Sequence, residues 1–197
     1  KFSSANNKLS TQMKATGEVM SVGRTIEESL LKAARSLEIG VNHLYMKKFE
    51  NFSDDEMLNY IKDGTDDRIY AIAELLRRKT DIGMICNATK IDMLFLEKIK
   101  NIVKTENKLR EHIGDTDTLY TAKKLGFSDE FIGKLWGMTG EEIYKIREKH
   151  GMFPVYKMID TCASEFESYI PYFYSTYEDE NESVVSDKKK IIVLGSG

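Results

Sequence analysis

The fold class of this chain is decided by one long stretch, Lys90-Ile-Asp-Met-Leu-Phe-Leu-Glu-Lys-Ile-Lys-Asn-Ile-Val-Lys-Thr-Glu-Asn-Lys-Leu-Arg-Glu-His112. Thr89 and Asp92 stand at its start, where a helix prefers residues that cap its free N–H groups. Apolar residues recur along it at helical spacing, and together they form one stripe: Ile91, Leu94, Phe95, Ile99, Ile102, Val103 and Leu109. The stretch therefore predicts one long helix, from about Lys90 to His112, with this stripe against a core.

Shorter helices are predicted on both sides of this stretch. Three pairs have the Thr/Ser-x-x-Glu spacing of a capping box: Thr25 with Glu28, Ser53 with Glu56, and Thr139 with Glu142. Glycines that follow apolar segments mark helix ends. The predicted helices run from 25 to a C-terminal Gly40, from 53 to Gly64, from Asp66 to Lys79, from 117 to 125, from 128 to 136 and from 139 to 150. Between the third and the longest helix we expect a turn around Asp81-Ile-Gly83.

The two ends of the chain lack the helical pattern. Residues 1–24 read as a loop or short strand, and the segment after Met152 is rich in aromatic residues and reads as extended or irregular. An acidic linker, Glu178-Asp-Glu-Asn-Glu182, precedes the C-terminal residues. The predicted fold class is all-α: a compact multi-helix bundle of two small helical clusters, with short non-helical N- and C-terminal segments.

The composition of the 197 residues is that of a globular protein, with 41% hydrophobic and 31% charged residues. A net charge of −3 gives no general attraction to nucleic acid or to anionic lipid. No apolar run approaches the length of a membrane span. The two cysteines, Cys86 and Cys162, have no Cys or His at ligand spacing, and reduced thiols in a cytoplasmic protein are the expected state.

The last residues, Ile191-Ile-Val-Leu-Gly-Ser-Gly197, form an apolar run followed by a Gly-x-Gly turn. Such a run is typical of a buried parallel strand that leads into a phosphate-binding loop. We interpret it as the first strand of a neighbouring nucleotide-binding domain. Without its sheet we expect it to be frayed, or paired with residues 19–22.

The sequence contains few candidates for a catalytic or ligand-binding site. The three histidines, His43, His112 and His150, are dispersed and are expected at the surface or at helix caps. Cys162 is a conceivable nucleophile, but a buried structural thiol is the favoured interpretation. Asp160 and Glu165 are conceivable as an acid–base pair, although caps or ion pairs are favoured. The sequence thus predicts no catalytic, cofactor-binding or metal-binding residue.

Two further patterns invite a nucleic-acid interpretation. The short helices of residues 125–147 resemble a helix-turn-helix, but acidic residues share the last helix with its basic ones. The basic triplet Arg77-Arg-Lys79 is expected to be a solvated helix end. An aromatic segment near the C-terminal end could stack on bases, and its members are Tyr169, Tyr172, Phe173, Tyr174 and Tyr177. Packing within the protein is favoured, because the residues that follow are acidic.

Five strings in the chain resemble the large subunit of carbamoyl-phosphate synthetase, in the order in which that family has them. They are Gln12-Met-Lys-Ala-Thr-Gly-Glu-Val-Met-Ser-Val-Gly-Arg-Thr25, Thr89-Lys-Ile-Asp-Met-Leu-Phe-Leu96, Val155-Tyr-Lys-Met-Ile-Asp-Thr-Cys-Ala-Ser-Glu-Phe166, Tyr174-Ser-Thr-Tyr-Glu178 and Lys190-Ile-Ile-Val-Leu-Gly-Ser-Gly197. The segment that departs most from the family is His43 to Asn51.

The resemblance implies three parts. Residues 1–25 would end the first ATP-grasp half, which makes carboxyphosphate. Residues 26–180 would form the helical oligomerisation domain, and residues 181–197 the linker and first strand of the second half, which makes carbamoyl phosphate.

The resemblance also implies the activity of the parent enzyme, which joins bicarbonate, glutamine-derived ammonia and two ATP for arginine or pyrimidine synthesis. The parent uses ATP, Mg²⁺ or Mn²⁺ and K⁺, with a glutaminase small subunit as partner. The family's ATP and metal residues match no position here, so this segment is expected to be non-catalytic and to associate with itself and with the rest of the large chain.

One residue has a role by the resemblance alone. Met13 corresponds to a position near the wall of the tunnel that carries carbamate, and an ordinary core position is the alternative. Rival functions are a free-standing helical interaction module, a DNA-binding module and an ATP-binding enzyme. We expect no binding to nucleic acid or membrane. The sequence leaves open the pathway, the effectors, whether the glutaminase is fused, and which surface self-associates.

Overall fold

The computed structural model describes residues 4–15, 18–166, 172–193 and 195. The helices are α1 (Ile26–Ser36), the 3₁₀ helix η1 (Lys47–Asn51), α2 (Asp54–Tyr60), α3 (Arg68–Arg77), α4 (Ile82–Thr89), α5 (Met93–Glu111), α6 (Thr116–Lys124), α7 (Asp129–Trp136) and α8 (Gly140–Lys149). The chain divides into two units, residues 1–153 and 154–197. All of these helices lie in the first unit, which confirms the predicted all-α class.

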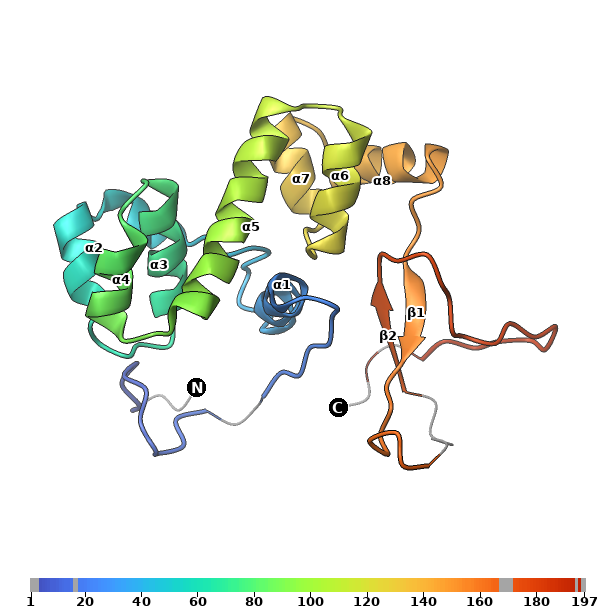
Figure 1. The fold of residues 1–197 in the computed structure, drawn as a ribbon, viewed down its shortest axis with the longest axis horizontal. Helices are drawn as coiled ribbons and strands as arrows, with labels where there is room; N and C mark the ends of the chain where they lie inside the picture. The colour runs from blue at the N-terminus through green and yellow to red at the C-terminus, as the bar shows by residue number, and fades with distance from the viewer. Residues whose placement is uncertain (1–3, 16–17, 167–171, 194, 196–197) are drawn as a thin grey trace. The chain divides into compact units, whose positions relative to one another are not determined.

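The helical unit is organised around α5. One cluster consists of η1 with α2, α3 and α4, and a second consists of α6, α7 and α8, with α5 between them (Figure 1). The long helix contacts α1, α3, α4, α6 and α7. Its fully or nearly fully buried side chains supply the shared core: Leu96, Ile99, Ile102, Val103 and Leu109. The two predicted clusters are therefore halves of one core, connected by one helix.

The predicted N-terminal caps are found at the starts of α1, α2 and α8. The hydroxyl groups of Ser53 and Thr139 accept from the N–H groups of Glu56 and Glu142, whose carboxylates accept in return, so both capping boxes form. Thr25 completes only half of its box. It accepts from the Glu28 N–H, but the Glu28 carboxylate accepts from the N–H of Arg24 at 2.7 Å.

Several predicted helix ends are wrong. The first helix ends at Ser36, and Glu38 rather than Gly40 is the first residue in the left-handed region, with φ 53°. The second ends at Tyr60, before Gly64, where the chain turns without a positive φ. The third begins after Asp67 instead of Asp66. Glycine marks an end only where the backbone needs a positive φ, which the sequence does not reveal.

The predicted turn around Asp81 is a helix, α4. The Asp81 side chain caps it by accepting from the Met84 N–H. Gly83 lies in its first turn, where a Cβ would lie 2.9 Å from the capping Asp81 oxygen. Gly83 therefore leaves room for the Asp81 cap at the start of α4, and the prediction that it marks a turn is wrong. Lys90, with φ 59°, ends α4, so the long helix begins at Met93 and not at Lys90.

The apolar stripe of the long helix is only partly buried. Leu94 and Phe95, predicted to face the core, are 56% and 49% exposed, and Met93 beside them is 39% exposed. Ile91 is half-buried. The remaining residues of the predicted stripe are buried as expected.

The second unit is a small antiparallel hairpin of β1 (Val155–Met158) and β2 (Phe173–Thr176), with Val155 opposite Thr176 and Met158 opposite Phe173. The prediction of extended structure after Met152 is confirmed. Ile191, Ile192 and Val193 form neither helix nor strand and are more than 80% exposed. Residues 19–22, the alternative partner expected from the sequence, are likewise neither helix nor strand.

Candidate functional site

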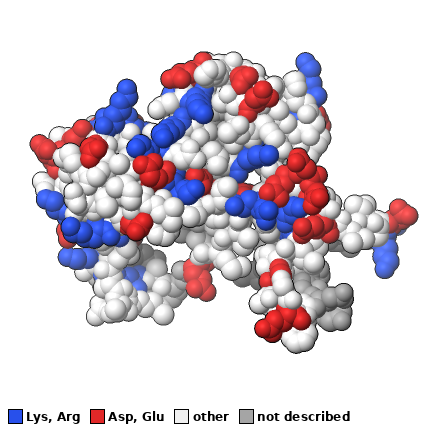
Figure 2. Space-filling view, viewed as in Figure 1, with Lys and Arg blue, Asp and Glu red and all other residues white. Residues whose placement is uncertain are grey.

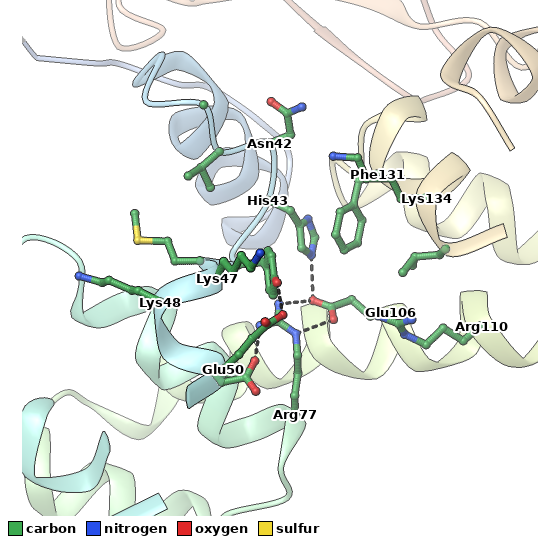
Figure 3. A pocket seen from close by; sticks show the side chains of 16 residues that line it. Asn42, His43, Lys47, Lys48, Glu50, Arg77, Glu106, Arg110, Phe131 and Lys134 are labelled. Carbon is green, nitrogen blue, oxygen red and sulfur yellow. Dashed lines mark hydrogen bonds and ion pairs between the residues drawn. The ribbon is translucent and has the colours of Figure 1, made fainter. Parts of the chain in front are cut away.

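A buried ionic cluster lies where the two helical clusters meet. Glu106 on α5 is 1% exposed, and His43, in the loop between α1 and η1, is 2% exposed. His43 Nε2 lies 2.8 Å from Glu106 Oε1, and Arg77 at the end of α3 donates from Nε and Nη2 to the two Glu106 oxygens, each at 2.8 Å (Figure 3). One carboxylate thus joins three segments that are distant in the sequence.

The electrostatics of the cluster are fixed by burial and by these partners. Burial by itself raises the pKa of the Glu106 carboxyl, but the hydrogen bonds and charges of Arg77 and His43 together lower it to about 2. Burial lowers the pKa of His43, against the opposing effect of Glu106, so the imidazole is neutral. The cluster is therefore an Arg–Glu ion pair with a neutral histidine as a further donor to the carboxylate.

The cluster is held in place by aromatic and backbone contacts. The His43 ring stacks on Phe131 of α7 with a centroid distance of 3.7 Å, and lies 4.8 Å from the Phe127 ring. Arg77 Nη2 also donates to the Leu44 carbonyl at 2.6 Å. Within the described part of the chain, His43 Nδ1 is a buried atom without a hydrogen-bond partner.

Two predictions about these residues are wrong. His43 is not a surface or cap histidine, because it is enclosed by α5 and α7. The basic end of α3 is not simply solvated either. Arg77 is largely buried, and Arg78 donates to the carbonyls of Phe52, Phe49 and Glu50, which fixes η1 against α3. A spacing signal for Glu106 was present: it follows Ile99, Ile102 and Val103 at i+7, i+4 and i+3, on the buried face of α5.

An open cavity of about 750 Å³ adjoins the cluster. Its lining includes His43, Arg77 and Glu106 together with three basic residues from different elements, Lys47 of η1, Arg110 of α5 and Lys134 of α7 (Figure 3). The lining also contains the apolar side chains of Val41, Met46 and Leu135. The sequence did not indicate this cavity, since its parts meet only through the fold.

In the last of the helices that resembled a helix-turn-helix, Arg147 and Lys145 have acidic partners within the chain. Arg147 of α8 is 6% exposed and binds Asp129 of α7, with Nη2 2.6 Å from Oδ2. Lys145 pairs with Glu141 on the same helix. Over the face shown in Figure 2, acidic groups lie beside basic ones instead of leaving one continuous basic surface. This arrangement does not favour a groove-binding helix, and the expected absence of DNA binding stays a prediction.

Further candidate residues are Met13, the two cysteines and the other two histidines. Met13 is 75% exposed, so the core alternative is wrong, while its tunnel role stays a prediction. Cys86 and Cys162 are half-buried free thiols, and the Cys86 thiol donates to the Ile91 carbonyl at 3.4 Å. His112 and His150 end α5 and α8, as expected for cap histidines.

The candidate acid–base pair belongs to the second unit. Asp160 accepts from the N–H groups of Cys162 and Ser164 in a turn that starts no helix, and these bonds lower the pKa of its carboxyl. Glu165 is exposed. Among the aromatic residues, Tyr169 lies outside the described residues, while Phe173 and Tyr174 belong to β2. Tyr172 is 56% exposed.

Residues 18–151, which contain every helix from α1 to α8, match the family model described as carbamoyl-phosphate synthetase large chain, oligomerisation domain. The chain belongs to this family. The resemblance proposed from the sequence strings is thereby confirmed, and the match ends two residues before the boundary between the two units. The predicted boundaries at 25 and 180 stay predictions.

Membrane-spanning helices and metal sites are the remaining classes of functional feature. None of the helices in the described residues is long and apolar enough to cross a membrane. Residues 4–15, 18–166, 172–193 and 195 contain no group of three or more His, Cys, Asp or Glu side chains arranged to hold a metal ion.

Proposed function

We propose that this chain is the self-associating segment of a carbamoyl-phosphate synthetase large chain and performs no chemistry itself. The observation that carries the proposal is the family match over residues 18–151, which contain α1 to α8 of the described part of the chain. The parent would be a glutamine-hydrolysing ligase of the cytoplasm that makes carbamoyl phosphate from bicarbonate, ammonia and two ATP, for arginine or pyrimidine synthesis. ATP, Mg²⁺ or Mn²⁺, K⁺ and the glutaminase subunit would act on parts of the enzyme other than this segment.

The start of α5 supports a contact surface on the helical unit. Met93, Leu94 and Phe95 are consecutive, 39–56% exposed and apolar, and we call them the 93–95 patch. Between Ile82 and Leu96, Lys90 and Asp92 are the charged residues, in a chain in which 31% of residues are charged. Exposed apolar side chains grouped at one helix start are typical of interaction sites. In a domain whose family is described by oligomerisation, we assign the patch to contact with a second copy of the chain.

Light scattering across a range of concentrations tests self-association. The average mass is expected to rise with concentration from that of the 22.6 kDa chain toward a multiple of it. A constant monomer mass at millimolar concentration would refute self-association by this segment.

The non-catalytic role has its own test. An enzyme with an ATP site would be stabilised against heat by Mg-ATP at concentrations far above its dissociation constant. We expect no shift of the melting temperature. A saturable rise with Mg-ATP would overturn the proposal that the segment takes no part in nucleotide chemistry.

A further inference from the structure

We infer that the cavity lined by Lys47, Arg110 and Lys134 binds a small organic polyanion, a compound with a phosphoryl group or with two or more carboxylates. This site goes beyond self-association, and nothing in the family description assigns it. The cavity lies wholly within the helical unit, between the α1–η1 loop, α3, α5 and α7. Its volume of about 750 Å³ is that of an ordinary small-molecule site.

The charge arrangement of the lining is the main argument. Each of its three carboxylates already has an internal donor: Glu50 accepts from Tyr45, Glu74 from Arg77 and Arg78, and Glu106 from His43 and Arg77. Its basic groups are not all used in this way. In the described helical unit, Lys47, Arg110 and Lys134 are exposed, and their side chains form no ion pair or hydrogen bond. Because the Tyr45 hydroxyl is neutral, Glu50 still offsets one of these three charges, and the cavity is left with a net positive charge.

The position of these basic groups favours one shared ligand over separate counterions. They come from η1, α5 and α7, and each lines the same cavity. Arg110 follows Glu106 by one helical turn, so it lies on the face of α5 that carries the buried cluster. Charges that converge on one cavity from separate elements reinforce each other at a polyanion, which makes electrostatic binding stronger there than at a flat surface.

The residues at the floor and walls of the cavity also restrict which ligands fit. Arg77 and Glu106 form a bidentate pair, and the His43 ring is fixed by its stacking on Phe131, so the floor is rigid before any ligand arrives. Val41, Met46 and Leu135 provide apolar surface beside the basic groups. The ligand is thus expected to carry a carbon skeleton as well as its anionic groups.

Isothermal titration calorimetry of the full chain with pyrophosphate and with citrate tests the inference. Pyrophosphate represents phosphoryl ligands and citrate represents polycarboxylates. We expect saturable binding of at least one probe at one site per chain, with a dissociation constant below about 1 mM, and weaker binding as salt is added. The probe that binds more tightly identifies the class of anion. Absence of saturable binding of either probe up to about 10 mM would overturn the inference.

A pair of double variants locates the site. Arg110→Gln with Lys134→Gln removes two of the three basic groups and is expected to weaken binding at least about tenfold, because each charge-assisted hydrogen bond has that order of effect. The control, Lys104→Gln with Lys108→Gln, removes the same charge from exposed positions on α5 that do not line the cavity. An equal loss in both variants would show attraction to overall charge instead of a site. Circular dichroism of both variants verifies the fold.

Discussion

At the start of α5, the three apolar side chains of residues 93–95 are exposed to solvent, whereas further along the same helix the carboxylate of Glu106 is fully enclosed. Leu94 is 56% exposed and Glu106 is 1% exposed, which is the reverse of what their chemistry favours. The two exceptions have different physical origins. Glu106 is buried because His43 and Arg77 supply its hydrogen bonds within the chain. Leu94 has no such internal explanation, and under the proposal of self-association a partner surface would cover it.

The largest expected effect is at the buried carboxylate. Glu106→Ala leaves Arg77 buried without its bidentate partner and is expected to lower the free energy of unfolding by about 3–5 kcal/mol. Urea denaturation monitored by circular dichroism measures it. Glu97→Ala on the same helix is the control, since its pair with Lys100 is solvent-exposed and contributes less than about 1 kcal/mol. Equal losses of stability in the two variants would show that the buried cluster contributes no more to stability than an exposed ion pair.

Two neighbouring leucines separate the core face of α5 from the 93–95 patch. Leu96 is fully buried, and Leu96→Ala is expected to cost about 2–5 kcal/mol through the cavity it leaves. Leu94→Ala is expected to change the stability of the monomer by less than about 0.5 kcal/mol. Denaturation at low protein concentration, where association is negligible, provides the comparison. Similar losses at the two positions would mean that Leu94 belongs to the core.

The pH dependence of stability reports on Glu106. Its carboxyl pKa is about 2 in the folded chain and 4.5 in the reference state, so the unfolded chain binds the extra proton between these values. The contribution is therefore complete above about pH 4.5 and is lost as pH falls toward 2, which amounts to about 3 kcal/mol. Urea denaturation at pH 6 and pH 3 for the wild type and for Glu106→Gln measures it. An unchanged slope in the variant would contradict the low pKa of Glu106.

A smaller effect than that of Glu106→Ala concerns the geometry of the Arg77–Glu106 pair. Arg77→Lys keeps the charge but loses the planar fork that donates to both Glu106 oxygens and to the Leu44 carbonyl. We expect a loss of about 1–2 kcal/mol in the free energy of unfolding, less than for Glu106→Ala, since an ammonium still neutralises the carboxylate. A loss as large as that of Glu106→Ala would mean that geometry, not charge, dominates the cluster.

The contrast between Leu94 and Glu106 also explains how much of the fold and of the buried cluster can be predicted from the sequence. Capping residues such as Ser53 and Thr139 act through neighbours three residues away, so the starts of α2 and α8 could be predicted. Apolar spacing shows which residues share a face of α5, but not where along the helix the core ends. For this reason the spacing wrongly predicts Leu94 in the core. Residues 43, 77 and 106 are brought together only by packing between segments, which no local pattern encodes.

Self-association through the 93–95 patch is tested most directly by sedimentation equilibrium of the chain and of Leu94→Glu. A charge in the centre of an apolar contact removes association, while an exposed position tolerates it in the monomer. We predict that the mass of the wild type rises with concentration, and that Leu94→Glu remains at 22.6 kDa with an unchanged circular dichroism spectrum. A wild type that stays monomeric, or a variant that associates as the wild type does, would contradict the account.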